Sequence, residues 1–348
     1  AFAPFINGLV LENIVTQSQK DMNKMYAETG SDVRFEIIDY DRNFSSSEIE
    51  WRIDLGSVAA LYGVDEIIVV DRAEHGFTGV VSRSSLERNQ WFTDLVNTRL
   101  NGNNPLTITT RYPLAGDIES IIDIGALSVE VDNETLDLRP GRVVTRFDRG
   151  MNHFVSEVSW EGVSVSDKVQ MEDVALTYDL QKISTYIWDG EVAYGIERIQ
   201  VHDADQNFEL VDARGDYSLD YDNKSKMLSA GGELKIGSLL TKGREVAETL
   251  VRLEVNNIDA QGYEEFMELY SRTMYTLLDD VSAAQGDPAQ MEQVMQEQAA
   301  ATGLQFMSAY EKFLKKGLEI KITDLSARLP KGQITGDLEV KLMKDLTF

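Results

Sequence analysis

Residues that could perform acid–base or nucleophilic chemistry are few in this chain and far apart. The three histidines, His75, His153 and His202, do not have the spacing of metal ligands. His75 lies in a predicted turn, where a general base would need a nucleophile close by. The serine run 45–47 is more typical of a turn than of a nucleophile. The sequence therefore predicts no catalytic residue, and we expect that the protein is not an enzyme.

Motifs that bind nucleotides or metals are also missing from the sequence. It contains no Gly-x-Ser-x-Gly, no P-loop, no Gly-x-Gly-x-x-Gly and no His-Glu-x-x-His. The segment that starts at Asp203 begins like a calcium loop, but Phe208 replaces the required glycine and Arg214 the final glutamate. A solvated acidic turn is the main interpretation and a looser calcium site the alternative. We expect no cofactor and no metal site.

A helical segment over residues 261–316 carries a stronger signal, because it is rich in methionine and aromatic side chains. Apolar residues recur there at three- and four-residue steps, which predicts an amphipathic helix, and Asp287-Pro288 predicts a second helix start and hence a helical hairpin. Unbranched methionines adapt to apolar partners of variable shape. The candidate ligand-binding residues are Phe266, Met267, Tyr270, Met274, Met291, Met295, Phe306, Met307 and Tyr310. The alternative is that this stripe packs permanently on a sheet as core.

The rest of the chain predicts the sheet that such a hairpin would cover. A first helix is expected over 9–29 and another over 84–100, and alternating strands with turn residues between them follow from 106 to 250. The predicted fold class is mainly β (α+β), with long curved antiparallel sheets, an N-terminal helix and a C-terminal helical hairpin packed on the sheet. Residues 1–105 would start the sheet and 106–348 would form its body, within one continuous domain.

Composition limits the partners that the chain can have. Its 33 Lys and Arg residues against 59 Asp and Glu residues give a net charge of −26, which disfavours binding to nucleic acid or to anionic membrane surfaces. Residues 259–300 alone contain nine acids and one base, Arg272, so a membrane-surface helix is disfavoured there. No cysteine is present, which excludes disulfides and thiolate chemistry, and no run of about 18 apolar residues predicts a membrane span.

Several short motifs resemble the YdgA-like family of bacterial envelope proteins of unknown function. The segment 4–8 with Glu12 is similar to the one that follows the family's N-terminal membrane anchor, and residues 253–270 are similar to its strand-to-helix transition. Two further elements resemble its strand pair, which carries Tyr, Gly or Arg, Phe and Ser-Ser, and its His-Gly-Pro-Phe element, although the proline is absent here; they comprise Tyr40, Phe44, Ser45, Ser46, Glu74, His75, Gly76 and Phe77. The resemblance implies a periplasmic domain tethered to the bacterial inner membrane by an N-terminal segment that is absent here. The strand pattern also resembles that of AsmA-like proteins, whose curved sheets are associated with lipid handling.

Three functional hypotheses follow from these observations. The first is a non-catalytic envelope protein that binds a lipid or another apolar ligand in a sheet groove capped by the methionine-rich hairpin. The second is a structural or protein-interaction module of the cell envelope that recruits an envelope protein partner. The third is a hydrolase whose site the sequence does not mark. They are ranked in that order.

Overall fold

The computed structural model describes residues 3–131, 134–166, 168–203, 206–241, 244–283, 305–314 and 316–344. Its helices are α1 (Ala3–Glu28), the 3-10 turn η1 (Gly56–Val58), α2 (Ala59–Tyr62), α3 (Gln90–Thr98), α4 (Ala260–Ala283) and a further helix over 305–314. Within these ranges, no helix has both the length and the apolarity that a membrane span requires.

Seventeen strands make up most of the described chain. They are β1 (Arg34–Arg42), β2 (Ser46–Asp54), β3 (Glu66–His75), β4 (Gly79–Ser85), β5 (Leu106–Pro113), β6 (Ile118–Ile124), β7 (Leu127–Val131), β8 (Glu134–Leu138), β9 (Gly141–Phe147), β10 (His153–Val165), β11 (Val169–Lys182), β12 (Trp188–Asp203), β13 (Gln206–Asp222), β14 (Met227–Thr241), β15 (Arg244–Asp259), β16 (Glu319–Leu329) and β17 (Gly332–Lys341).

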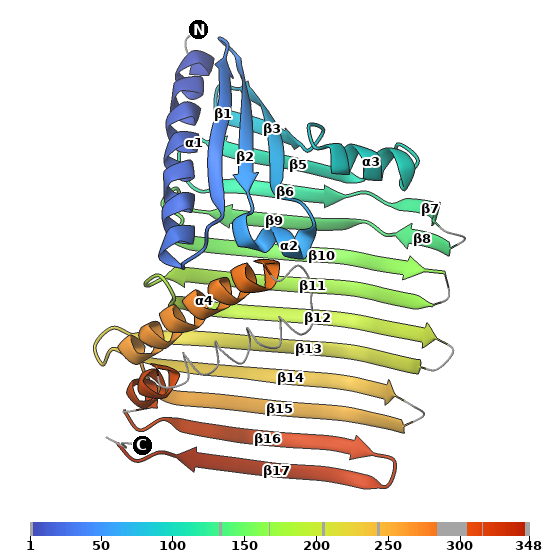
Figure 1. The fold of residues 1–348 in the computed structure, drawn as a ribbon. Coiled ribbons are helices and arrows are strands. Elements are labelled where there is room, and N and C mark those ends of the chain that lie inside the picture. Colours follow the sequence, from blue (N-terminus) through green and yellow to red (C-terminus); the bar gives the residue numbers. More distant parts are fainter. Residues whose placement is uncertain are drawn as a thin grey trace.

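All of these strands belong to one antiparallel sheet (Figure 1). Each strand from β1 to β6 pairs with the next, β6 pairs with β9, and the series then continues from β9 to β17. The hairpin β7–β8 prolongs β6 and β9, and β8 pairs with the far end of β10. The predicted fold class is therefore confirmed: a long antiparallel sheet with an N-terminal helix and C-terminal helices.

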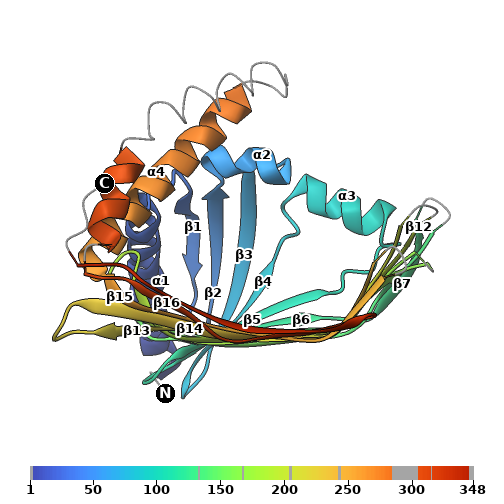
Figure 2. The same cartoon turned by 90° about the horizontal axis from the view of Figure 1, so that it is seen from below.

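Side chains alternate between two faces of the sheet, and we call the face that contacts α1 and α4 the inner face. At the N-terminal strands, Leu11 and Val15 of α1 pack on Ile49, Trp51 and Val80 of the inner face. At the C-terminal end, the helices pack their own apolar residues on the inner face; this cluster includes Leu219, Leu228, Ile258, Ala260, Tyr263 and Phe313. The sheet curves around the side that carries the helices (Figure 2). An apolar inner face and a polar outer face are what period-two alternation produces.

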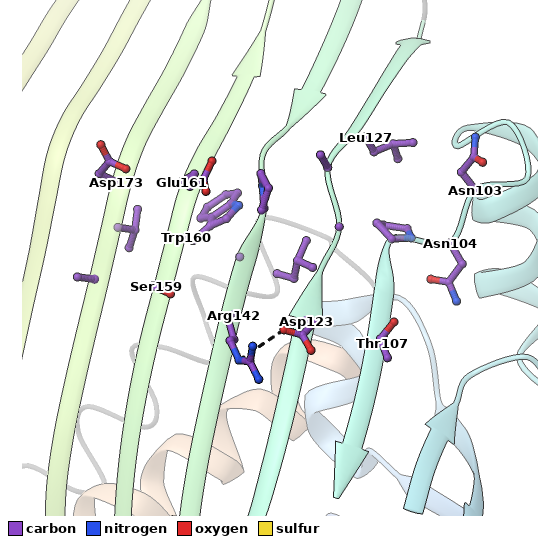
Figure 3. Close-up of a pocket in the computed structure, with 18 residues that line it drawn as sticks. Asn103, Asn104, Thr107, Asp123, Leu127, Arg142, Ser159, Trp160, Glu161 and Asp173 are labelled. Atoms are coloured by element: carbon purple, nitrogen blue, oxygen red, sulfur yellow. Dashed lines mark ion pairs between the residues drawn. The ribbon is translucent and has the colours of Figure 1, made fainter.

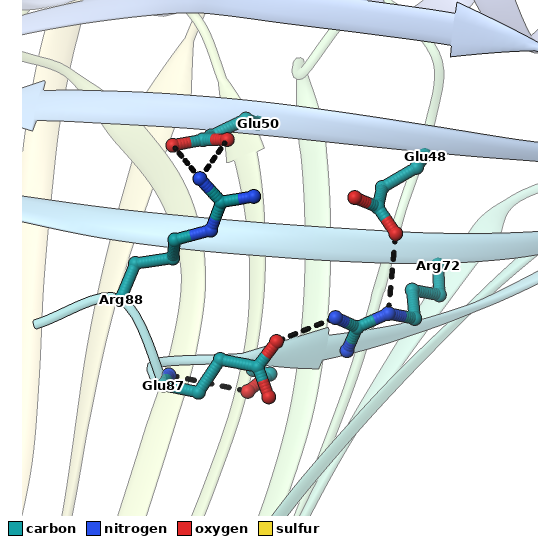
Figure 4. Close-up of polar contacts among 6 residues, drawn as sticks. Glu48, Glu50, Arg72, Glu87 and Arg88 are labelled. Carbon is teal, nitrogen blue, oxygen red and sulfur yellow. Dashed lines mark hydrogen bonds and ion pairs between the residues drawn. The ribbon is translucent and has the colours of Figure 1, made fainter. Parts of the chain in front are cut away.

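The outer face is held by ion pairs between neighbouring strands. Arg72 of β3 contacts Glu48 of β2, at 3.2 Å, and Glu87, while Arg88 contacts Glu50 of β2 at 3.2 Å; Glu87 and Arg88 follow β4 (Figure 4). Similar pairs continue at Arg146 with Glu119 and at Arg252 with Glu233 on later strands. Exposed pairs of this kind add little stability individually, so the burial of apolar side chains on the inner face dominates the energetics.

One line across the strands interrupts the ladder of hydrogen-bonded pairs, and we call it the crease. Between β10 and β15, each pair of neighbouring strands leaves one residue of either strand unpaired, and the register is the same on both sides of it. At the same position along the sheet, β6 ends before β7 begins and β8 ends before β9 begins. Three crease residues have a positive φ, namely Asp173 (48°), Asp212 (50°) and Glu248 (49°). The crease consists of 125–126, 139–140, Glu161, Asp173, Glu197, Asp212, Gly237 and Glu248.

The apolar pattern of each strand shifts by one residue at the crease. In β11, apolar residues are odd-numbered before it (Val169, Met171) and even-numbered after it (Val174, Leu176). The shift recurs on each strand from β10 to β15 and in the β6–β7 and β8–β9 pairs. A residue outside the extended region re-aims the side chains that follow it, and a one-residue slip exchanges the two faces of a strand. On β11, β13 and β15, where the crease residue has a positive φ, the two effects cancel and the apolar side chains stay on one face of the strand.

Some element boundaries differ from those expected. The helix predicted over 84–100 begins only at Gln90, because Ser84 and Ser85 extend β4 and the side chain of Asn89 binds the backbone of Ile68 on β3. The predicted helical segment 261–316 comprises α4 and the helix over 305–314, and the predicted start of a second helix at Asp287-Pro288 lies outside the described residues.

Candidate functional site

The inner face of the C-terminal strands carries two adjacent apolar rows that run across the sheet. Register places Val192, Tyr217, Gly232, Leu253, Ile322 and Leu338 side by side on β12 to β17. The neighbouring row consists of Tyr194, Gly215, Leu234, Val251, Leu325 and Gly336. Tyr194, Tyr217 and Leu253 remain 43%, 46% and 42% exposed. Large apolar side chains that form a continuous exposed surface mark a binding surface more often than isolated ones do.

A hollow of about 360 Å³ lies on these rows and is lined mainly by apolar atoms. A glycine shapes it, because Gly232 pairs with Tyr217 and Leu253 and contributes no side chain between the walls that these two residues form. A further glycine seats Tyr194: a Cβ added at Gly215 would lie 2.5 Å from the Tyr194 ring. Burial raises the pKa of the Tyr217 hydroxyl, so this group stays neutral near pH 7. The hollow can therefore accept an apolar group and offers no charged partner on its inner rows.

The aromatic members of the predicted ligand-binding residues form a cluster of their own on the helices. The ring of Phe266 is in contact with Phe306, Tyr310 and Phe313, with centroids 5.1–6.1 Å apart, and it stacks on Tyr270. This cluster joins α4 to the helix over 305–314. Tyr263 of α4 continues it to the sheet, because it packs with Phe313 and against Leu228 and Ile258.

The other predicted residues of the helices differ in exposure. Met267 is half-buried, whereas Tyr270, Met274, Met307 and Tyr310 are exposed. Met291 and Met295 lie outside the described residues. The residues that line the hollow come from the sheet, and sequence reasoning missed them. The available signal was the pair Gly231-Gly232 in a strand, which marks a place where another group can approach closely.

A serine–histidine pair lies at the opposite end of the inner face, beneath α1. The His75 Nε2 atom is 2.9 Å from the Ser47 Oγ atom, and the two residues are only 5% and 3% exposed. Gly8 of α1 lies directly against the ring, since a Cβ there would be 2.4 Å from the His75 Cε1 atom. Among the described residues, no carboxylate forms an ion pair or hydrogen bond with this imidazole. The pair is therefore enclosed between α1 and the first strands, and His75 also borders a hollow of about 370 Å³ that Tyr112 and Pro113 help to line.

Burial perturbs the titratable groups of this N-terminal end. Desolvation lowers the pKa of His75, so the neutral imidazole is favoured in the folded state. Burial also raises the pKa of Asp71, although Ser84 and the Trp51 indole donate hydrogen bonds to its carboxyl group. Tyr112 has its pKa raised by burial as well. Perturbed groups can mark active sites, but here they are packed between α1 and the sheet.

The segments that carry the family resemblance meet at this end. Ser46 pairs with Glu74 across β2 and β3, and the backbone N–H of His75 donates to the Ser45 carbonyl at 2.8 Å. From α1, Asn7 donates to the Gly76 carbonyl at 2.6 Å and Phe5 stacks on Phe44. The Tyr40 hydroxyl is 3.4 Å from the Ser47 Oγ atom. Phe77 is 72% exposed. Phe44, His75 and Gly76 therefore contact α1 and help to hold it against the first strands.

A larger hollow of about 860 Å³ opens along the crease (Figure 3). Its polar side chains include Asp123 and Arg142, which form an ion pair at 3.6 Å, and its aromatic component is Trp160, whose indole N–H donates to the Arg139 carbonyl. Glu161 and Asp173 of the crease also line it. Apolar residues such as Pro105, Ile124, Leu127 and Val174 line it as well, so this hollow combines charged and apolar groups.

Comparison with known proteins places the chain in a family without assigned chemistry. The family described as "Bacterial protein of unknown function (DUF945)" matches residues 1–347. No curated protein matches the chain. No solved structure matches it either.

Proposed function

The chain belongs to this DUF945 family of bacterial proteins of unknown function, and we propose that it is a non-catalytic protein that binds a lipid acyl chain on the inner face of its C-terminal strands. The observation that carries this proposal is the exposure of Tyr194, Tyr217 and Leu253 on two apolar rows that cross six strands.

The dimensions and chemistry of the rows favour an extended apolar ligand. Six strands at a spacing of about 4.8 Å make a row roughly 24 Å long, which is the length scale of an acyl chain. Each methylene group that leaves water on such a surface contributes about 0.8 kcal/mol. The hollow around Gly232 lies on this path. A branched or charged ligand would fit it less well.

The helices supply an adaptable wall in this proposal. The start of α4 and the helix over 305–314 pack at this end of the inner face through Tyr263 and Phe313, and Tyr270, Met307 and Tyr310 are exposed side chains of these helices, whereas Met274 lies farther along α4, where Ser271 donates to the Thr29 carbonyl. Because methionine side chains are unbranched and polarizable, such a wall can adjust to chains of different length. The phase shift at the crease supports the same proposal, since it keeps apolar residues on one face beyond the rows.

The resemblance to YdgA-like proteins supports a setting for this activity. It favours a periplasmic domain that an N-terminal segment tethers to the inner membrane, in a compartment where lipids must cross water. The net charge of −26 supports a domain that does not adhere to anionic headgroups and so takes up single lipid molecules. The buried Ser47–His75 pair beneath α1 supports a function without catalysis.

Binding of a fluorescent fatty acid tests the proposal. We expect cis-parinaric acid to bind saturably to the purified protein and palmitate to displace it. Leu253→Glu should weaken this binding at least about tenfold, because it places a charge in the apolar row. Thr335→Glu adds the same charge on the outer face of β17 and should leave binding unchanged. Absence of saturable binding to the wild-type protein, or equal loss in both variants, would overturn the proposal.

A further inference from the structure

The first turns of α1 meet three hairpin ends of the N-terminal strands. Asn7 of α1 donates to the Gly76 carbonyl in the β3–β4 turn at 2.6 Å, and the Leu114 N–H in the β5–β6 turn donates to the backbone of that same turn at 3.3 Å. The β1–β2 hairpin end joins them, because the Phe5 ring of α1 stacks on the Phe44 ring with centroids 6.2 Å apart (Figure 1). Each of these segments carries large exposed apolar side chains. We call them the apolar tip: Phe5, Ile6, Leu9, Phe44, Phe77 and Leu114.

The apolar tip exposes a large area to water. Phe77 is 72% exposed, Phe44 57% and Leu114 51%. At roughly 150–250 Å² for each large apolar side chain, the exposed fractions of the six residues amount to about 600 Å². The β13–β14 hairpin, which ends at the same edge of the sheet, carries the exposed polar residues 223–225 instead. A contiguous apolar patch of this size is at the upper end for monomeric proteins and marks an interaction surface.

The size and shape of the apolar tip favour a lipid bilayer over a protein partner. A standard protein interface buries about 1,200–2,000 Å² in total. Two copies of this patch would reach the lower limit only if every one of its side chains were buried completely. The side chains also belong to the ends of four separate segments. Because hydrophobic burial is non-directional, a bilayer can take up such separate side chains without a complementary surface.

Two arginines lie beside the apolar tip. The Arg42 guanidinium is 5.3 Å from the centre of the Phe5 ring and pairs with Glu12 at 3.0 Å. The Arg149 guanidinium donates to the Leu114 carbonyl at 3.0 Å, and no carboxylate of the described residues forms an ion pair with it. Arginine stems can follow apolar groups while their charged ends stay in a polar layer, where they bind phosphate groups well. Both arginines therefore complement the headgroups of phospholipids.

We propose that the apolar tip inserts into the surface of a zwitterionic phospholipid bilayer. The net charge of −26 repels anionic headgroups, so attachment depends on the apolar side chains and the two arginines. The two turns that resemble family motifs then have a role, since each supplies one exposed phenylalanine, Phe44 or Phe77. Attachment at the tip does not depend on acyl-chain binding to the rows of β12 to β17.

Flotation with phosphatidylcholine vesicles tests the insertion. We expect the 348-residue chain to float with the vesicles, and Phe77→Ser combined with Leu114→Ser to lower the partition coefficient about tenfold or more. Leu61→Ser combined with Tyr62→Ser is the matched control, because these residues are 65% and 70% exposed on α2, at the opposite end of β2. The control should change the partition coefficient by less than about twofold. Urea unfolding checks that both variants fold, and the result does not change if cis-parinaric acid fails to bind the wild type.

A fluorescent label then reports insertion at a single position. The chain contains no cysteine, so Phe77→Cys and Tyr62→Cys can each carry one nitrobenzoxadiazole group. We expect vesicles to shift the emission to shorter wavelength at position 77 and to leave it unchanged at position 62. Phosphatidylglycerol vesicles should bind less protein at low salt, where the repulsion of a chain of charge −26 is least screened.

Three results would overturn the proposal: no flotation with phosphatidylcholine vesicles, equal losses in the two double variants, or tighter binding to the anionic vesicles. A wild-type dimer that the combined change at Phe77 and Leu114 dissociates would also overturn it, in favour of a second copy of the chain at the apolar tip.

Discussion

The two ends of the sheet use the same alternation of side chains for opposite purposes. At β1 to β5, α1 covers the inner face, so that Leu11 and Ile49 are each 1% exposed. At β12 to β17, side chains in equivalent inner positions, such as Tyr217 and Leu253, stay more than 40% exposed. The difference arises from the covering helix rather than from the strands. An alternating strand pattern therefore predicts an apolar face but does not predict whether that face becomes core or binding surface.

Truncation in the covered end should have the largest effect on stability. Leu11→Ala removes a fully buried side chain between α1 and the sheet, and we expect a loss of about 2–5 kcal/mol in the free energy of unfolding measured with urea. A loss below about 1 kcal/mol would mean that α1 is not part of the core, and the contrast between the two ends would fail.

Overpacking of the same contact should have the next largest effect. Gly8→Ala places a methyl group 2.4 Å from the His75 ring. Such crowding costs about 1–3 kcal/mol, which exceeds the 0.5–1 kcal/mol or so that alanine gains over glycine in a helix. Thermal unfolding should therefore show a lower melting temperature. Gly195→Ala is the control, because its added Cβ meets ordinary contacts at 3.7 Å; an equal loss there would remove the special role of the Gly8–His75 contact.

The covered end should also make the free energy of unfolding depend on pH, through the buried His75, and this effect should be smaller than the two above. Burial lowers the pKa of His75 below its ordinary value of 6.5. The unfolded chain therefore takes up the proton first as the pH falls, so the stability that the neutral imidazole contributes is present above pH 6.5 and is lost below it. Urea unfolding at pH 8 and at pH 5.5 should show a smaller pH-dependent loss in His75→Gln than in the wild type. Identical losses in both proteins would contradict this assignment.

Truncation in the open end should have the smallest effect. Leu253→Ala removes a side chain that is 42% exposed, and we expect a change below about 1 kcal/mol in the same urea experiment. A loss as large as that of Leu11→Ala would show that another part of the chain covers the row, and it would turn the proposed binding surface into core.

Much of the fold could be predicted from the sequence because the underlying patterns are local. Alternation along strands and the helical spacing of residues in α1 and α4 depend on near neighbours, and both predicted the correct element types. The start of α3 was wrong because Asn89 binds β3, a contact between residues 21 positions apart. The binding hollow was missed for the same kind of reason: it needs Tyr194, Tyr217 and Leu253 from three strands, and only the register brings them together.

The roles of individual residues also depend on contacts between separate elements, which the sequence does not show directly. His75 and Ser47 looked unrelated in the sequence, and their hydrogen bond follows from the pairing of β2 with β3. The binding role of the methionine-rich helices stays a prediction. The residue types show that these side chains can adapt to a ligand, but they do not show which surface the side chains face. Phe266 illustrates this limit, because its neighbours are aromatic residues of the next helix rather than the sheet.

The crease has a mechanical consequence for the molecule. A thin sheet that is folded along a line becomes stiff against bending of that line, as a corrugated panel does. The crease crosses the strands from β6 to β15. It therefore stiffens the sheet against bending in the direction that runs from strand to strand. Deletion of Asp212 alone would remove the crease residue of β13. The side chains on one side of the deletion would then point to the opposite face of the sheet. Changes of chain length are consequently tolerated at the hairpin loops, whereas each strand that the crease crosses must keep its residue count.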